Sequence, residues 1–93
     1  MDSNMFSVAL DSNTEGTFTF RNEGHTLGNA LRYFLIKNKD VEFVGYSVPH
    51  PAEPLMNIRV QTHTANPLST LENSLYNLDE YCDLLLTKLE ALD

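Results

Sequence analysis

The last third of the chain carries a continuous apolar stripe, and this pattern constrains the fold more than any other. Between Leu68 and Leu92 the apolar residues are separated alternately by three and four positions, which is the spacing of one face of an α-helix. Asn66 is a favourable N-cap and Pro67 a favourable first-turn residue, so the pattern predicts a helix that begins there. The members of the stripe are Leu68, Leu71, Leu75, Leu78, Cys82, Leu85, Leu89 and Leu92.

This predicted helix is longer than the rest of the chain is wide. At about 1.5 Å per residue it extends for roughly 39 Å. The preceding residues would form a globule only about 28 Å across. Each buried leucine stabilises a structure by about 1.5–3 kcal/mol, so the whole stripe is worth on the order of 10–20 kcal/mol. We therefore expect the helix to project from its domain and a partner to cover the stripe.

Four shorter patterns before this helix predict strands. Apolar and polar residues alternate over residues 6–10, 17–21 and 56–61. Residues 41–48 carry apolar side chains on both faces, which predicts a strand in the centre of the sheet.

Residues 25–38 predict a helix with Thr26 as its N-cap. Gly28 either permits a close approach of the backbone or is simply tolerated there. The order of elements predicts an α+β fold with two layers, in which a small, mostly antiparallel sheet carries both helices on one side. We expect residues 1–93 to form a single domain. The apolar face of the first helix comprises Leu27, Ala30, Leu31, Phe34 and Leu35.

The charge of the chain argues against several classes of partner. The formal net charge is −7 over 93 residues, and acidic residues dominate the last third. Because a phosphate backbone requires a basic surface, we expect no direct binding to nucleic acid. The N-terminal residues lack the pattern of a signal peptide, and no stretch approaches the roughly 20 apolar residues of a membrane span. A single cysteine, Cys82, allows no internal disulfide, so we expect a soluble intracellular protein with Cys82 as a small buried hydrophobic residue.

No residue pattern predicts catalysis or a bound cofactor. The spacings of His25, His50, His63 and Cys82 match no metal site. No serine or cysteine lies in a nucleophile motif, and the glycines do not form a phosphate-binding loop. We expect no cofactor, no metal and no enzymatic activity, and we expect acidic residues outside the stripe, such as Asp79, to face solvent.

Two long segments identify a family. Residues 23–32, EGHTLGNALR, resemble the signature of the alpha-like subunits of cellular RNA polymerases. Residues 41–62, VEFVGYSVPHPAEPLMNIRVQT, are similar to the small alpha-like subunit, and the resemblance extends over nearly the whole chain from Phe18. Residues 32–33, 36–38, 41–43 and 56–59 look more like the subunit shared by polymerases I and III than like that of polymerase II. Gly24 departs from the acid that eukaryotic members tend to carry, so a salt bridge made by that acid is not carried over.

The resemblance implies a non-catalytic assembly subunit of RNA polymerases I and III, located in the nucleus including the nucleolus. Such a subunit forms an obligate heterodimer with a larger alpha-like subunit through its two helices. The pair is a platform for the catalytic subunits, including the second-largest. Two alternatives remain: the equivalent subunit of polymerase II or of an archaeal polymerase, and a free-standing homodimeric coiled-coil adaptor.

The candidate interface residues lie on both predicted helices. For those on the first helix, the pattern does not say which belong to the core and which to the interface. Arg32 is either a polar contact to the partner or to the second-largest subunit, or a solvated side chain. His50, between Pro49 and Pro51, is either a docking contact or part of a rigid turn. The predicted interface set is Leu27, Leu31, Tyr33, Phe34, Leu35, Leu71, Leu75, Leu78, Cys82, Leu85 and Leu89.

Overall fold

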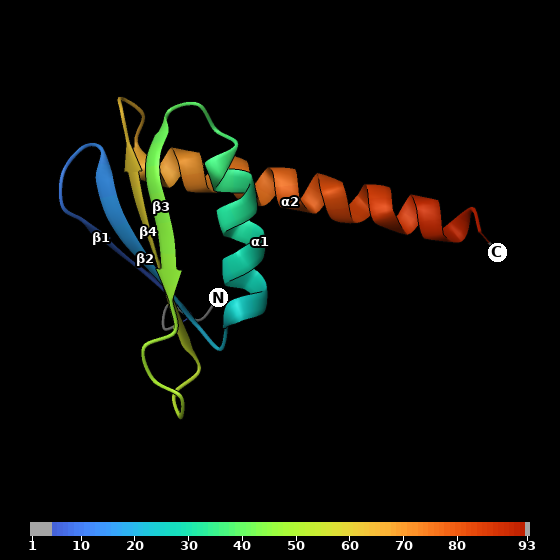
Figure 1. Cartoon of the computed structure of the whole chain (residues 1–93), viewed down its shortest axis with the longest axis horizontal. Helices are drawn as coiled ribbons and strands as arrows, with labels where there is room; N and C mark the ends of the chain where they lie inside the picture. Colours follow the sequence, from blue (N-terminus) through green and yellow to red (C-terminus); the bar gives the residue numbers. More distant parts are fainter. Residues whose placement is uncertain (1–4, 93) are drawn as a thin grey trace.

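A four-stranded antiparallel sheet carries two helices on one face (Figure 1). The computed structural model describes residues 5–92. The strands are ordered β1-β2-β4-β3, and every neighbouring pair is antiparallel. The predicted two-layer α+β fold is therefore confirmed. The elements are β1 (Phe6–Leu10), β2 (Glu15–Arg21), α1 (His25–Ile36), β3 (Val41–Ser47), β4 (Leu55–Thr62) and α2 (Pro67–Glu90).

The core lies between the sheet and the helices. Alternation along β4 places Met56, Ile58 and Val60 on the helix side, where all three are fully buried. The opposite face of the sheet is mostly polar, and on it the hydroxyl of Thr19 donates a hydrogen bond of 2.7 Å to Oδ1 of Asn57. This one-sided burial explains why both helices gather on a single face.

β3 lies at an edge of the sheet, so the prediction that it is central was wrong. Val44 is buried on the helix side, whereas Phe43 points to the other face and is 49% exposed. A register shift interrupts the pairing with β4 between Val41 and Phe43. The strand looked apolar on both faces because Phe43, which is exposed, lies on the face away from the helices. The register shift beside it is of a kind common at sheet edges.

The starts of the two helices differ in how they are capped. The predicted cap of α2 is confirmed, because Oδ1 of Asn66 accepts a hydrogen bond of 2.8 Å from the backbone N–H of Leu68. The predicted cap of α1 was wrong: the N-cap is Gly24, and Thr26 lies within the first turn. Gly28 fulfils the close-approach alternative, since a Cβ there would lie 2.5 Å from a ring carbon of Tyr46.

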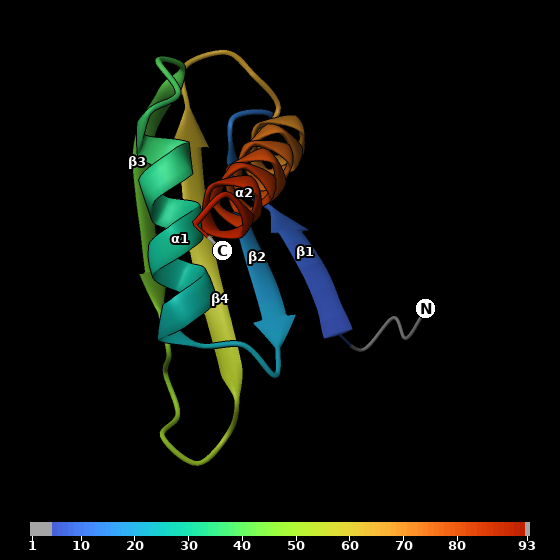
Figure 2. The same ribbon diagram turned by 90° about the vertical axis from the view of Figure 1, so that its right-hand side faces the viewer.

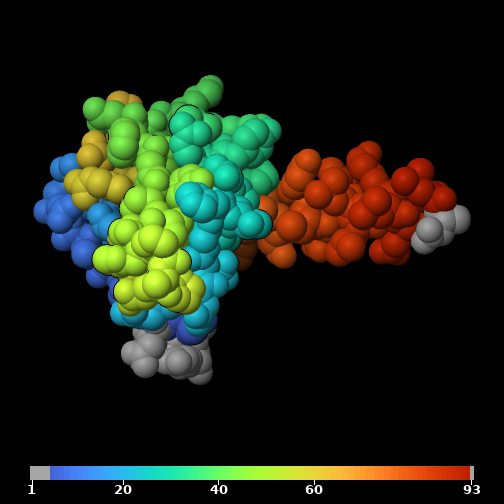
Figure 3. Space-filling model, turned by 60° about the horizontal axis from the view of Figure 1, so that its bottom comes forward, coloured from blue at the N-terminus to red at the C-terminus, as the bar shows by residue number. Residues whose placement is uncertain are grey.

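The second half of α2 leaves the body of the protein (Figure 1), and in Figure 2 this helix is seen nearly end-on, with its C-terminal end toward the viewer. Leu78 is the last residue of α2 that packs against the core, and every residue from 79 to 92 is exposed. We call residues 79–92 the projecting arm, which Figure 3 shows standing clear of the globular part. The molecule measures 48 × 35 × 24 Å, and the predicted projection of the long helix is confirmed. Among residues 5–92, neither helix combines the length and apolar character needed to cross a bilayer.

Candidate protein interface

The projecting arm exposes large apolar side chains to solvent. Leu85 is 41% exposed and Leu89 is 59% exposed, although both belong to the predicted stripe. An exposed apolar surface of this extent usually marks a site of association. The exposed apolar residues of α2 and the turn after it are Leu75, Tyr76, Tyr81, Leu84, Leu85, Leu86, Leu89 and Leu92.

An apolar groove lies beside the base of this arm. It has a volume of about 430 Å³ and runs between α2, the start of α1 and the first two strands. Leu75 belongs both to this groove and to the exposed stripe, so the groove adjoins the stripe that continues along the arm. Its lining consists of Met5, Phe6, Phe20, Arg21, Glu23, Leu27, Leu68, Glu72 and Leu75.

Aromatic side chains fill the angle between the end of α1 and the middle of α2. The ring of Phe34 contacts those of Tyr33 and Tyr81 edge to face, at centroid distances of 5.2 and 5.9 Å. Nζ of Lys37 lies 4.3 Å from the centroid of Tyr33, which is within the range of a cation–π contact. Phe34 and Lys37 also line two hollows, of about 350 and 430 Å³, against α2.

Asp40 fixes the loop that leads into α2. Its carboxylate accepts hydrogen bonds from the backbone N–H of Ala65 at 2.6 Å and from the hydroxyl of Thr64 at 3.0 Å. The bond from Ala65 is the main reason that the pKa of Asp40 is lowered, since it favours the charged form. This contact ties the loop before β3 to the loop before α2, and so fixes where the helix begins.

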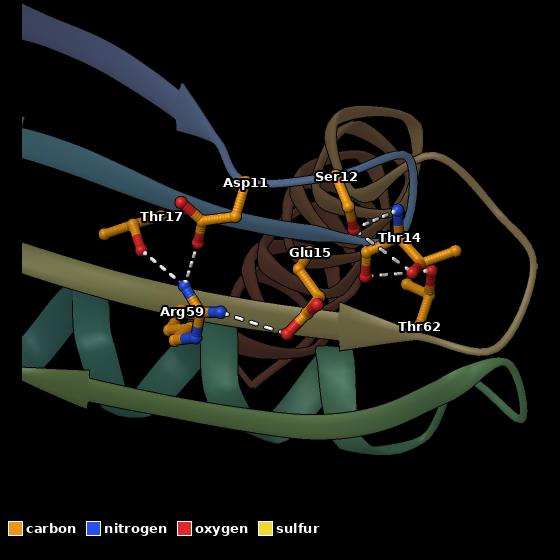
Figure 4. Close-up of polar contacts among 7 residues, drawn as sticks. All are labelled: Asp11, Ser12, Thr14, Glu15, Thr17, Arg59 and Thr62. Carbon is orange, nitrogen blue, oxygen red and sulfur yellow. Dashed lines mark hydrogen bonds and ion pairs between the residues drawn. The ribbon is translucent and has the colours of Figure 1, made fainter.

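Arg59 holds the β1–β2 turn against β4 on the open face of the sheet (Figure 4). Its guanidinium donates to Asp11 at 2.5 Å, to Glu15 at 3.1 Å and to Thr17 at 3.2 Å. β1 supplies Phe6 to the apolar groove on the opposite face. The Arg59 cluster therefore helps to position one wall of that groove.

Three members of the predicted interface set belong to the chain's own core. Leu31 and Leu35 are 0% exposed and Leu71 is 1% exposed, so these side chains have no free surface to offer a partner. Leu31 and Leu35 therefore fall on the core side of the division that the sequence left open, and the assignment of Leu71 to the interface is corrected. Leu27 and Leu78 are partly buried against the same core, and Phe34 is half-buried. The exposed members of the set are Tyr33, Leu75, Cys82, Leu85 and Leu89.

The remaining predicted residues also lie at the surface. Cys82 is exposed on the projecting arm, so its predicted burial is not met within this chain. Arg32 on α1 and His50 in the β3–β4 loop are both exposed. Among residues 5–92, no three His, Cys, Asp or Glu side chains gather closely enough to hold a metal ion.

Several residues of the apolar surface were missed by the sequence analysis. Leu84 and Leu86 flank Leu85 on the arm and lie outside the alternating three-and-four pattern. The uninterrupted run of three leucines was the available signal. Phe6 and Phe20 were assigned to strands, and no local pattern indicated that they would line a groove with α2.

The sequence is similar to a known family and to subunits of RNA polymerases I and III. Residues 15–88 match the family model described as the RNA polymerase Rpb3/Rpb11 dimerisation domain. The RPAC2 subunit of RNA polymerases I and III from Saccharomyces cerevisiae is 47% identical over 79 residues, which cover 84% of this chain and 56% of that protein. The chain thus spans little more than half the length of the yeast relative. RPAC2 from Danio rerio is also 47% identical, over 90% of this chain and 78% of that protein.

A solved structure supports the same fold. RNA polymerase subunit L from Thermoplasma acidophilum superimposes with a TM-score of 0.75 at 22% sequence identity, covering 92% of this chain and 87% of that one. At this level of identity the likeness concerns the path of the backbone over most of both chains.

Proposed function

The chain belongs to the RNA polymerase Rpb3/Rpb11 dimerisation-domain family, and on this premise we propose that it is the small alpha-like assembly subunit of DNA-directed RNA polymerases I and III. Relatives named as subunits of these two polymerases match 84% and 90% of the chain, which supports this assignment. The role is non-catalytic: the subunit pairs with a larger alpha-like subunit, and the pair is the platform for the second-largest and other core subunits. It acts in rRNA, 5S rRNA and tRNA transcription, in the nucleus including the nucleolus.

The projecting arm is the observation that carries this proposal. Leu85 and Leu89 are exposed to solvent, on the part of α2 that no longer packs against the core of this chain. Burying each leucine stabilises a complex by about 1.5–3 kcal/mol, so covering several of them drives association strongly. An obligate contact of this kind buries about 2,000 Å² or more in total.

The partner contacts the arm and the apolar groove together. Leu75 connects these two surfaces, and Leu27 extends them onto α1. In the complex Cys82 is covered and packs as a small hydrophobic residue. The revised interface set is Leu27, Tyr33, Phe34, Leu75, Leu78, Cys82, Leu85 and Leu89.

Arg32 and His50 are assigned to polar contacts outside this apolar surface. Both side chains are exposed, on α1 and in the β3–β4 loop respectively. Pro49 and Pro51 restrict the backbone on either side of His50, so the loop presents its ring in a limited set of directions. These two residues are proposed contacts to the larger alpha-like or second-largest subunit. The net charge of −7 opposes direct contact with nucleic acid.

Co-expression with the larger alpha-like subunit tests the proposal. Leu85→Asp combined with Leu89→Asp places two carboxylates on the exposed stripe and should abolish recovery of the heterodimer. Substitution of Leu78 is less informative, because that side chain packs against the core. The matched control is Thr87→Asp combined with Ala91→Asp, which adds the same charge to other positions on the arm. Complex formation by the leucine variant equal to that of the control would refute this interface.

Two further measurements separate the alternatives. Co-purification from cells should recover subunits of polymerases I and III, and recovery with polymerase II subunits instead would reassign the chain. Light scattering on the chain alone should show poor solubility or aggregation that co-expression relieves. A stable, monodisperse homodimer would favour a free-standing coiled-coil adaptor.

A further inference from the structure

A row of carboxylates follows one edge of the apolar stripe on α2. Glu72, Asp79, Asp83 and Glu90 are separated by seven, four and seven residues. At about 100° per residue they fall within a band about 40° wide on the helix surface. All four are exposed, and none of them takes part in the ion pairs formed within residues 5–92.

This carboxylate row lies on the groove side of the stripe. Glu72 lines the apolar groove together with Leu68 and Leu75. Lys88, the one basic residue of α2, lies beyond the opposite edge of the stripe, about 200° from the row when the angle is measured across the leucines. The two edges of the stripe therefore carry opposite charges.

We propose that the element covering the stripe is a helix of the larger alpha-like subunit that carries Lys or Arg along the edge facing the carboxylate row. This inference rests on the proposed function and adds the chemistry of the partner to it. Charges that flank an apolar seam decide which helix pairs with which, and in which orientation. A basic edge on the partner helix neutralises the carboxylate row at the margin of the contact. An acidic edge would repel the carboxylates, and an apolar edge would partly dehydrate them.

The same row disfavours antiparallel pairing between two copies of this chain. When two copies of a helix pair antiparallel about a two-fold axis, each edge of the stripe meets the same edge of the other copy. Two antiparallel arms packed stripe against stripe would therefore bring one carboxylate row against the other. Repulsion against a wrong partner is an ordinary source of specificity, so the row disfavours this antiparallel homodimer as well as stabilising the heteromeric complex.

A competition experiment tests the charge pairing. Wild-type chain and a variant, distinguished by mass, are co-expressed at equal levels with a limiting amount of tagged larger alpha-like subunit, and the ratio in the purified complex is measured. Asp79→Lys reverses a charge on the row, and we expect its incorporation to fall about tenfold. Glu80→Lys makes the same change at the adjacent residue, outside the row, and should be incorporated as well as wild type. Equal incorporation of the two variants would overturn the proposal.

A third variant separates this inference from the proposed function. If Leu85→Asp with Leu89→Asp is excluded from the complex while Asp79→Lys is retained, the heterodimer stands and the charge pairing fails. If the leucine variant is also retained, the proposed interface itself fails. Without the larger subunit, capture of untagged by tagged chain should increase for Asp79→Asn with Asp83→Asn, and unchanged capture would overturn the role of the row against self-pairing.

Discussion

The ring of Phe34 on α1 packs edge to face against the ring of Tyr81 on α2, with 5.9 Å between the centroids and 62° between the planes. Tyr81 lies about one turn beyond Leu78, the last residue of α2 that packs against the core. This aromatic pair therefore extends the support of α2 into the start of the projecting arm. It links the orientation of the arm to the body of the protein.

Phe34→Ala should weaken this support. Loss of a half-buried aromatic residue and its ring pair should lower the free energy of unfolding by about 1–3 kcal/mol. Thermal denaturation of the purified heterodimer measures the effect. Ile36→Ala, at an exposed position of the same helix, should change the midpoint much less. A similar loss for both variants would show that the Phe34–Tyr81 contact does not support the arm.

Gly28→Ala should destabilise the protein, although alanine is ordinarily the better helix residue. The added Cβ would lie 2.5 Å from Cδ2 and 2.8 Å from Cγ of Tyr46, so the ring itself must move. The phenol oxygen of Tyr46 is also 3.1 Å from Nδ1 of His25, which limits that movement. Overpacking of this kind costs about 1–3 kcal/mol. Denaturant titration should show this loss, whereas Asn29→Ala, at the next and exposed position, should be neutral or stabilising.

A second substitution tests whether the clash with Tyr46 is the cause. Tyr46→Ala in the Gly28→Ala background removes the obstructing ring. The double variant should therefore lose less stability than the sum of the two single losses. Additive losses would place the cause elsewhere.

Local spacing predicted the elements of this fold well. The three-and-four spacing of leucines and the Asn66–Pro67 pair mark α2 without reference to any other segment. Simple alternation likewise marks β4, from Leu55 to Thr62. These features are set by residues close together in the sequence, so the sequence carries them directly.

The arrangement of the elements was not contained in local spacing. Alternation assigns the side chains of β3 to two faces, but it does not say which strands lie beside it. The same helical period suits a core and an interface equally, so Leu71 and Leu85 look alike in the sequence. The structure separates them because the first turns of α2 rest on the body and the later turns do not.

Arg59→Met should loosen the β1–β2 turn more than the protein as a whole. The pKa of Arg59 is raised, chiefly by its hydrogen bond with Asp11, so the guanidinium stays charged in the folded protein. Its contribution to stability is therefore present at every pH below the ordinary pKa of arginine. The cluster is partly exposed, and salt screens such contacts. We therefore expect faster hydrogen exchange in β1, with little change in the thermal midpoint. Arg21→Met, at the other end of β2, is the matched control, and equal exchange in both variants would contradict this role.

Asp40 should make the stability of the protein depend on pH. The hydrogen bond from the backbone of Ala65, with those from Thr64, outweighs the opposing effect of burial and lowers its pKa below the ordinary value of 3.8. A carboxyl whose pKa is lower in the folded state stabilises the fold above its unfolded pKa, and this contribution is lost as the pH falls through the folded value. Asp40→Asn should therefore lower the thermal midpoint of the heterodimer at pH 7 and reduce its further decline below about pH 4. Glu53→Gln, in the exposed β3–β4 loop, should leave both quantities unchanged. If the wild type and Asp40→Asn lost stability in parallel down to the lowest pH, Asp40 would not be the group that anchors the base of α2.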